Sequence, residues 1–187
     1  MRMKLAGRMA ALAVLCLPYI AGAESQLTIG AGTASARLNF QVIVPRVLFL
    51  AVGTGNVSLA NNSTIDTVVF DYSSNPTALG TGVAAATITG NAVSVRVLGN
   101  NGQVEIAAAG SGTGLTNGTD TIAWTEISST SSDGTFPVPA VGATANPTLN
   151  SGRLTNRTAT WTYTYANTNI VAPGTYTGQV TYTASMP

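Results

Sequence analysis

The sequence has no histidine and a single cysteine, Cys16, and only 8% of its residues are charged. Its only lysine is Lys4, so every base after residue 23 is an arginine. Histidine, cysteine and lysine are the usual catalytic bases and nucleophiles, and the first two are the usual transition-metal ligands. Their scarcity argues against an enzyme, and we expect no metal and no cofactor.

Two acid pairs, Asp66 with Asp71 and Asp120 with Glu126, are the remaining candidates for carboxylate catalysis. Asp66 and Asp71 have opposite parity, so on one strand they would point to opposite faces. Asp120 and Glu126 would lie about 20 Å apart on an extended strand. Loop acids such as Asp133 leave only a weak calcium candidate, because the EF-hand spacing is absent.

The bases after residue 23 are scattered along the chain: Arg37, Arg46, Arg96, Arg153 and Arg157. A nucleic-acid-binding surface needs a dense basic patch to neutralise phosphates. We therefore expect no nucleic-acid partner.

Residues 1–23 have the pattern of a signal peptide. A basic start is followed by an apolar run at 12–20 and by the small residues Ala21, Gly22 and Ala23. The apolar run is shorter than the ~20 residues that a membrane span needs, and no longer run follows. Cleavage before Glu24 would remove Cys16, so we expect an exported chain with no disulfide and no transmembrane segment.

The C-terminal part contains two runs in which threonine alternates with apolar residues. In Arg157–Tyr165, one face carries Ala159, Trp161, Tyr163 and Tyr165. In Thr175–Met186, one face carries Tyr176, Val180, Tyr182, Ala184 and Met186. Period two with β-branched residues predicts two half-buried strands.

A third alternating run covers Ala36–Val44. One of its faces, which we expect to point inward, carries Ala36, Leu38, Phe40, Val42 and Val44. Pro45 cannot donate to a β-ladder, and a second apolar run, Arg46–Val52, follows it. These runs predict either a first strand that bends at Pro45 and changes sheets there, or two separate strands. The weakly alternating residues before it, 24–35, are expected to form a short N-terminal arm.

A hairpin is predicted where Val93–Leu98 and Gln103–Ala108 flank the turn residues 99–102, Gly-Asn-Asn-Gly. Pairing the two glycines brings apolar residues opposite each other and sets Arg96 opposite Glu105. Weaker strands are expected within 65–72, 83–89 and 120–127, and a long connection at 128–152. With about eight strands and no helix, the pattern predicts an all-β fold, most simply an immunoglobulin-like antiparallel β-sandwich over residues 36–187.

The run Pro173–Thr183, PGTYTGQVTYT, resembles the last strand of bacterial chaperone–usher pilus (fimbrial) subunits, in particular the archaic, spore-coat-U-like branch. The signal peptide, the arm and the strand bent at Pro45 are also similar to that family. The resemblance implies a sandwich that lacks one strand, which a periplasmic chaperone and then a neighbouring subunit would supply. It implies the donor residues Leu27, Ile29 and Ala31. It also implies an acceptor groove flanked by Tyr176, Val180, Tyr182, Ala184 and Met186.

We therefore expect an exported structural or adhesion protein, located in the periplasm, on the cell surface or in a fimbrium, that assembles by β-strand addition. The alternative is a self-contained exported β-sandwich that binds a ligand through its loops at 110–118 and 128–152. Trp161, Tyr163 and Tyr165 could stack on a sugar, but an inward strand face favours core packing for these residues.

Overall fold

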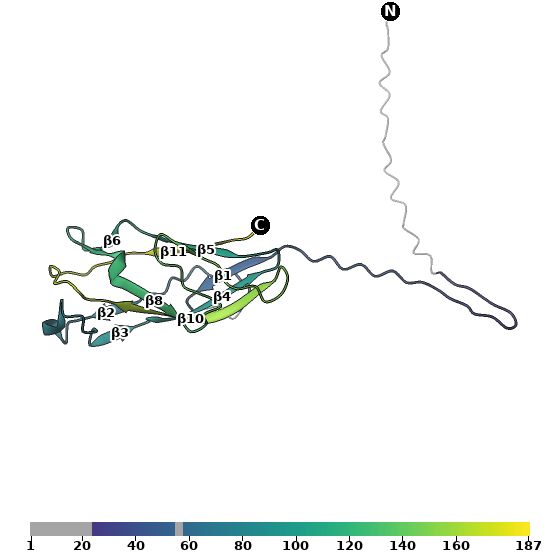
Figure 1. Ribbon diagram of the computed structural model, residues 1–187, viewed down its shortest axis with the longest axis horizontal. Coiled ribbons are helices and arrows are strands. Elements are labelled where there is room, and N and C mark those ends of the chain that lie inside the picture. Colours follow the sequence, from purple (N-terminus) through teal and green to yellow (C-terminus); the bar gives the residue numbers. More distant parts are fainter. Residues whose placement is uncertain (1–23, 55–57) are drawn as a thin grey trace, which may run out of the picture. The chain divides into compact units, whose positions relative to one another are not determined.

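The computed structural model describes residues 24–54 and 58–187 (Figure 1). They fall into two units, one ending at Val44 and one running from Pro45 to Pro187. The described residues form eleven strands and two short 3-10 turns, with no α-helix among them. The prediction of an all-β chain with antiparallel sheets is confirmed. The signal peptide expected at 1–23 lies outside the described residues.

The larger sheet contains four antiparallel strands in the order β1-β4-β10-β8. These strands are β1 (Leu48–Val52), β4 (Ala92–Gly99), β10 (Thr155–Tyr165) and β8 (Ile127–Ser131). In the centre of the sheet, Val95 of β4 lies between Val52 of β1 and Ala159 of β10. The strand β10, predicted from its alternating threonines, is confirmed and is the longest in the described chain.

The second sheet contains three antiparallel strands in the order β11-β5-β9. They are β11 (Val180–Ser185), β5 (Glu105–Gly110) and β9 (Thr144–Ala145). Two small pairs complete the fold. β2 (Val69–Asp71) pairs with β3 (Thr87–Thr89), and β6 (Gly114–Thr116) pairs with β7 (Thr121–Ala123). The 3-10 turns are η1 (Pro76–Ala78) and η2 (Trp124–Glu126).

The core contains side chains from both sheets. Val95 and Val97 of β4, Ile106 of β5 and Trp161 of β10 are fully buried, and so is Phe136 from the connection after β8. The Trp161 ring centroid lies 5.3 Å from that of Phe136 and 5.2 Å from that of Tyr182 on β11. Each such side chain contributes about 1.5–3 kcal/mol through burial, so this cluster holds the two sheets together.

The predicted hairpin between β4 and β5 is wrong, because the two strands belong to different sheets. The turn at 99–102 carries the chain from one sheet to the other. Arg96 lies instead between Ala51 of β1 and Thr158 of β10, and the structure has no ion pair between Arg96 and Glu105. The alternating apolar residues of both strands are buried as expected, since packing across a core satisfies the same pattern as pairing within a sheet.

The expected first strand is also corrected. β1 begins only at Leu48, and residues 36–44 form no strand and lie outside the unit that starts at Pro45. Their apolar side chains, which we expected to point inward, are exposed. The weaker strands are shorter than expected, and η2 interrupts the run at 120–127.

Candidate functional site

The strand β11 has one hydrogen-bonded edge and one unpaired edge. It pairs with β5 along Val180–Ser185, and no other described strand pairs with it. Val180, Tyr182, Ala184 and Met186 alternate with exposed residues and are only half-buried, although Tyr182, Ala184 and Met186 pack against the core. Tyr176, expected on the same strand, lies before β11, and its hydroxyl donates to the Ala172 carbonyl at 2.9 Å. A strand with a half-covered apolar face and a free edge can accept another strand.

The strand β1 repeats this arrangement on the larger sheet. It pairs only with β4, and its Leu50 and Val52 pack against the core while remaining half-exposed. β1 and β11 lie close together but belong to different sheets, and in the described residues no backbone hydrogen bond joins them. The two sheets therefore approach each other at two unpaired edges.

One end of this β1–β11 junction is fixed by the three residues before β1, Pro45–Val47, which we call the neck. Asn100 forms three hydrogen bonds with the neck. Its Oδ1 accepts from the Val47 N–H at 2.8 Å, its Nδ2 donates to the Pro45 carbonyl at 2.8 Å, and its own N–H donates to the Val47 carbonyl at 3.3 Å. The Arg46 guanidinium donates to the carbonyl of Pro187, just beyond β11. These hydrogen bonds hold the neck, whose residues form no turn.

Two hollows lie near β1 and β4. One, of about 100 Å³, lies between β1 and residues 60–64, and none of the described residues that line it is ionisable. A wider one, of about 410 Å³, lies at the start of β4 and contains a single acid, Asp66. The Asp66 carboxylate accepts from the Thr54 N–H at 2.6 Å and from the Thr54 hydroxyl at 2.9 Å. Within the described part of the chain, no acid other than Asp66 lines these hollows.

Three of the other candidate acids, Asp71, Glu126 and Asp133, accept hydrogen bonds from local donors. Hydrogen bonds from Ser73 hold the pKa of Asp71 below its ordinary value, and hydrogen bonds from Thr168 do the same for Glu126. Thr135 lowers the pKa of Asp133, the weak calcium candidate, in the same way. Among the described residues, no group of three or more such side chains could hold a metal ion. These hydrogen bonds therefore stabilise the carboxylate form of all three acids, of which Asp71 is exposed and Glu126 and Asp133 are partly exposed.

The aromatic residues of β10 do not form one sugar-binding platform. Trp161 is in the core, and the Tyr163 hydroxyl lies 2.8 Å from the Tyr182 hydroxyl. Burial raises the pKa of both tyrosines, so both phenols are neutral at physiological pH. Tyr165 packs instead against Phe70 and Tyr72, with ring centroids 6.2 and 6.1 Å away.

The loops expected to hold a ligand in the alternative function are largely part of the fold. The segment 110–118 contains β6, which pairs with β7. The connection at 128–152 begins in β8, supplies the buried Phe136 and contains β9. Neither segment brings together a set of convergent charged side chains.

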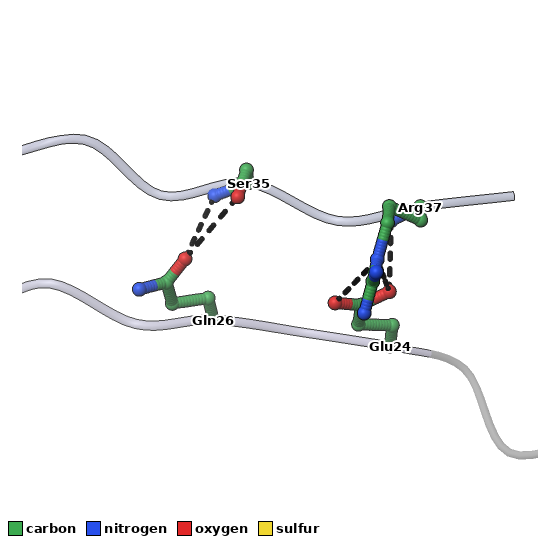
Figure 2. Close-up of polar contacts among 4 residues, drawn as sticks. All are labelled: Glu24, Gln26, Ser35 and Arg37. Atoms are coloured by element: carbon green, nitrogen blue, oxygen red, sulfur yellow. Dashed lines mark hydrogen bonds and ion pairs between the residues drawn. The ribbon is translucent and has the colours of Figure 1, made fainter.

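The described part of the first unit, residues 24–44, is an exposed chain that folds back on itself between 24 and 37 (Figures 1 and 2). Glu24 forms an ion pair with Arg37 at 2.9 Å, and Gln26 Oε1 accepts from the Ser35 N–H at 3.1 Å (Figure 2). Gly30, with φ of +97°, lies in the reversal between them.

This reversal separates the expected donor residues. Leu27 and Ile29 are exposed, at 85% and 92%, and they precede Gly30, whereas Ala31 follows it within the turn. In this conformation the three side chains do not lie on one straight strand. No strand pairing is formed by any of them in the described structure.

A longer apolar series follows the fold-back. Four side chains at every second position are exposed: Leu38 at 76%, Phe40 at 87%, Val42 at 84% and Val44 at 72%. We call these four residues the apolar stripe. They share one face of an extended chain. The sequence signalled their alternation but not their exposure.

No family model, curated protein or solved structure matches this chain. The described residues include no helix long and apolar enough to cross a membrane. The features that bear on function are therefore the unpaired edges, the neck and the apolar stripe.

Proposed function

We propose that the protein is an exported structural subunit that assembles by β-strand addition, and that its two sheets form an immunoglobulin-like sandwich lacking one strand. In such a sandwich, strands A, B, E and D form one sheet, and strands C, F and G form the other. The order β1-β4-β10-β8 fits A-B-E-D when the strands are taken in chain order, and β5 and β11 fit C and F. Strand G would pair with the outer edge of β11, where no described strand lies.

The observation that carries the proposal is the exposed apolar stripe on a chain that also has an unpaired β11 edge. The stripe has four apolar residues at every second position, and β11 with Met186 presents Val180, Tyr182, Ala184 and Met186 at the same spacing. An extended run over 38–44 spans about 23 Å, which suits a strand of this length. The two series match in number, spacing and chemistry.

Burial would make this pairing strong. Full burial of an aliphatic or aromatic side chain contributes about 1.5–3 kcal/mol, so four would contribute about 6–12 kcal/mol. Part of this gain offsets the loss of translational freedom and the ordering of the segment. Backbone hydrogen bonds along the β11 edge would add to it. The apolar stripe thus replaces Leu27, Ile29 and Ala31 as the proposed donor.

The same features would make a chaperone necessary before assembly. A free edge beside a half-covered apolar face, and a separate exposed apolar stripe, both favour aggregation. A periplasmic chaperone that covers the edge before assembly would prevent it. The final location would then be the cell surface or a fimbrium.

The proposal predicts that a peptide with the sequence 36–44 binds the protein. The chain is expressed from its full sequence, purified from the periplasm of a bacterial host, and mixed with the peptide. At a peptide concentration 100 times Kd, the folded state should gain about 2.7 kcal/mol in unfolding free energy, because the peptide binds only that state. Thermal unfolding and light scattering would show a higher Tm and smaller particles, as the peptide competes with assembly.

Two control peptides make this test specific. A peptide with the same composition but with the alternation scrambled should not bind, and neither should a peptide with the sequence 24–31. Equal binding of the scrambled peptide, or no binding of any peptide to a protein that remains monomeric, would contradict the proposal. The second result is the one expected for a self-contained module.

A further inference from the structure

We propose that the outward face of the larger sheet binds a polysaccharide that carries carboxylate groups, and that Arg96 of β4 receives one of these carboxylates. β11 belongs to the other sheet, so this site is separate from the edge proposed for strand addition. Arg96 was expected opposite Glu105, but it forms no ion pair among the described residues.

The Arg96 side chain is held against the sheet without a partner. It is only half-exposed, and its Nε is buried with no acceptor in the described structure. The two terminal nitrogens are not buried in this way, so they remain open to a ligand. Because Nε is enclosed, the guanidinium has little freedom to move. Its open end is therefore preorganised to bind a carboxylate through two parallel hydrogen bonds.

The other arginines of the described chain lack this combination. Arg37, Arg46 and Arg157 each donate to an oxygen atom of the chain. Arg153, in the turn before β10, is exposed. In the described part of the chain, Arg96 alone is both partly enclosed and unpaired, so it is the arginine best placed to hold an external anion.

The residues beside Arg96 on this face are neutral and able to form hydrogen bonds. Ser94 and Thr158 are its nearest hydroxyl neighbours, and Asn156 and Thr160 lie on either side of Thr158 along β10. None of these four side chains has a hydrogen-bond partner in the described residues, and Asn156 and Thr160 donate only through their backbone N–H groups. Among the described strands of this sheet, no other charged residue takes an outward position. The face thus presents one positive charge among available hydroxyl and amide groups.

This arrangement suits a sugar acid better than other anions. A nucleic acid needs several cations to neutralise consecutive phosphates, and this face has one. An acidic peptide that joins a sheet pairs with an open strand edge, whereas β4 and β10 are hydrogen-bonded on both sides. A sugar acid offers a carboxylate to Arg96 and hydroxyls to its neighbours. Phe49 and Leu98, which lie opposite each other and are half-buried, give the C–H face of a sugar ring an apolar surface beside Arg96.

Polygalacturonate, a polymer of sugar acids, tests the proposal on the unmodified protein. The full chain is purified from the periplasm of a bacterial host, and its binding to the immobilised polymer is measured by biolayer interferometry. The methyl ester of the polymer keeps the ring hydroxyls and removes the charge, so it should bind about tenfold more weakly or less. Polyglutamate keeps the carboxylates without the hydroxyls and should also bind about tenfold more weakly or less.

Three results with these polymers would overturn the proposal. The first is a protein that does not bind polygalacturonate, and the second is equal binding of the methyl ester. The third is equal binding of polyglutamate, which would identify an acidic peptide as the ligand. A wild type that stays monomeric but binds polygalacturonate selectively would contradict strand addition and support this site, so the two proposals fail separately.

Substitutions of Arg96 place the binding on this face. Arg96→Gln should weaken binding about tenfold or more, and Arg96→Lys, which keeps the charge but not the planar pair of donors, should also bind more weakly than the wild type. Arg153→Gln is the matched control, since it removes the same charge from an exposed turn, and it should bind like the wild type. Wild-type affinity in a folded Arg96→Gln variant, or an equal loss in Arg153→Gln, would overturn the proposal. The polymer comparison needs no variant and decides the question if Arg96→Gln does not fold.

Discussion

Replacing Phe40 and Val42 with aspartate is expected to abolish assembly while leaving the domain from Pro45 to Pro187 folded. Both side chains belong to the apolar stripe and are exposed in the single chain, so the change removes no core contact. In the assembled form, each replacement would remove about 1.5–3 kcal/mol of stabilisation from side-chain burial. At 1.4 kcal/mol per tenfold, the assembly constant should fall about 100-fold to 10⁴-fold, before the cost of burying two charges. Sedimentation velocity over a concentration series measures this change.

Two matched variants make the result specific. Asn39→Asp with Gln41→Asp adds the same two charges to the opposite face of the same segment and should assemble nearly as well as the wild type. Leu27→Asp with Ile29→Asp tests the donor residues that the family resemblance implied, and it should also assemble. If the Leu27 and Ile29 variant fails to assemble while the Phe40 and Val42 variant assembles normally, the donor is the segment with Leu27 and Ile29 and not the apolar stripe.

Replacing Phe136 with alanine is expected to lower the unfolding free energy by about 3–5 kcal/mol, the usual range for removing a buried phenylalanine. Phe136 is fully buried against Trp161, although it lies in a connection rich in serine, glycine and proline. Its loss would leave a cavity between the two sheets that the rigid neighbouring strands cannot fill. Urea denaturation followed by the fluorescence of Trp124 and Trp161 provides the measurement.

Phe40→Ala is the matched control for this experiment, because it removes the same side chain from an exposed site. In dilute, monomeric protein it should change the unfolding free energy by less than about 0.5 kcal/mol. An equal loss of unfolding free energy in the two variants would contradict the burial of Phe136 between the two sheets.

The two C-terminal strands could be predicted from the sequence because each has a single regular pattern. In β10 and β11 threonine alternates with aromatic or small apolar residues. The observed burial follows that alternation throughout β11, whereas in β10 Thr160 and Thr162 on the opposite face are also half-buried. In contrast, Phe136 has no periodic neighbours, so only the three-dimensional structure places it in the core. The serine, glycine and proline content of its segment predicts only a long connection.

The alternation of apolar residues gave wrong predictions where the fold depends on what covers an apolar face. The valines of β4 and Ile106 of β5 alternate as in a hairpin, but they meet across the core from different sheets. Leu38 and Phe40 alternate as in an inward-facing strand, but their side chains are exposed. Alternation shows that one face is to be buried. It does not say whether the partner is the same sheet, the opposite sheet or another molecule.

The most direct measurement is the structure of the assembled protein by electron cryomicroscopy. We expect one additional strand along the outer edge of β11, with Leu38, Phe40, Val42 and Val44 turned toward the core and the chain continuing into the neck of a neighbouring copy. A map in which β11 pairs directly with β1, with the segment 36–44 lying elsewhere, would contradict this account.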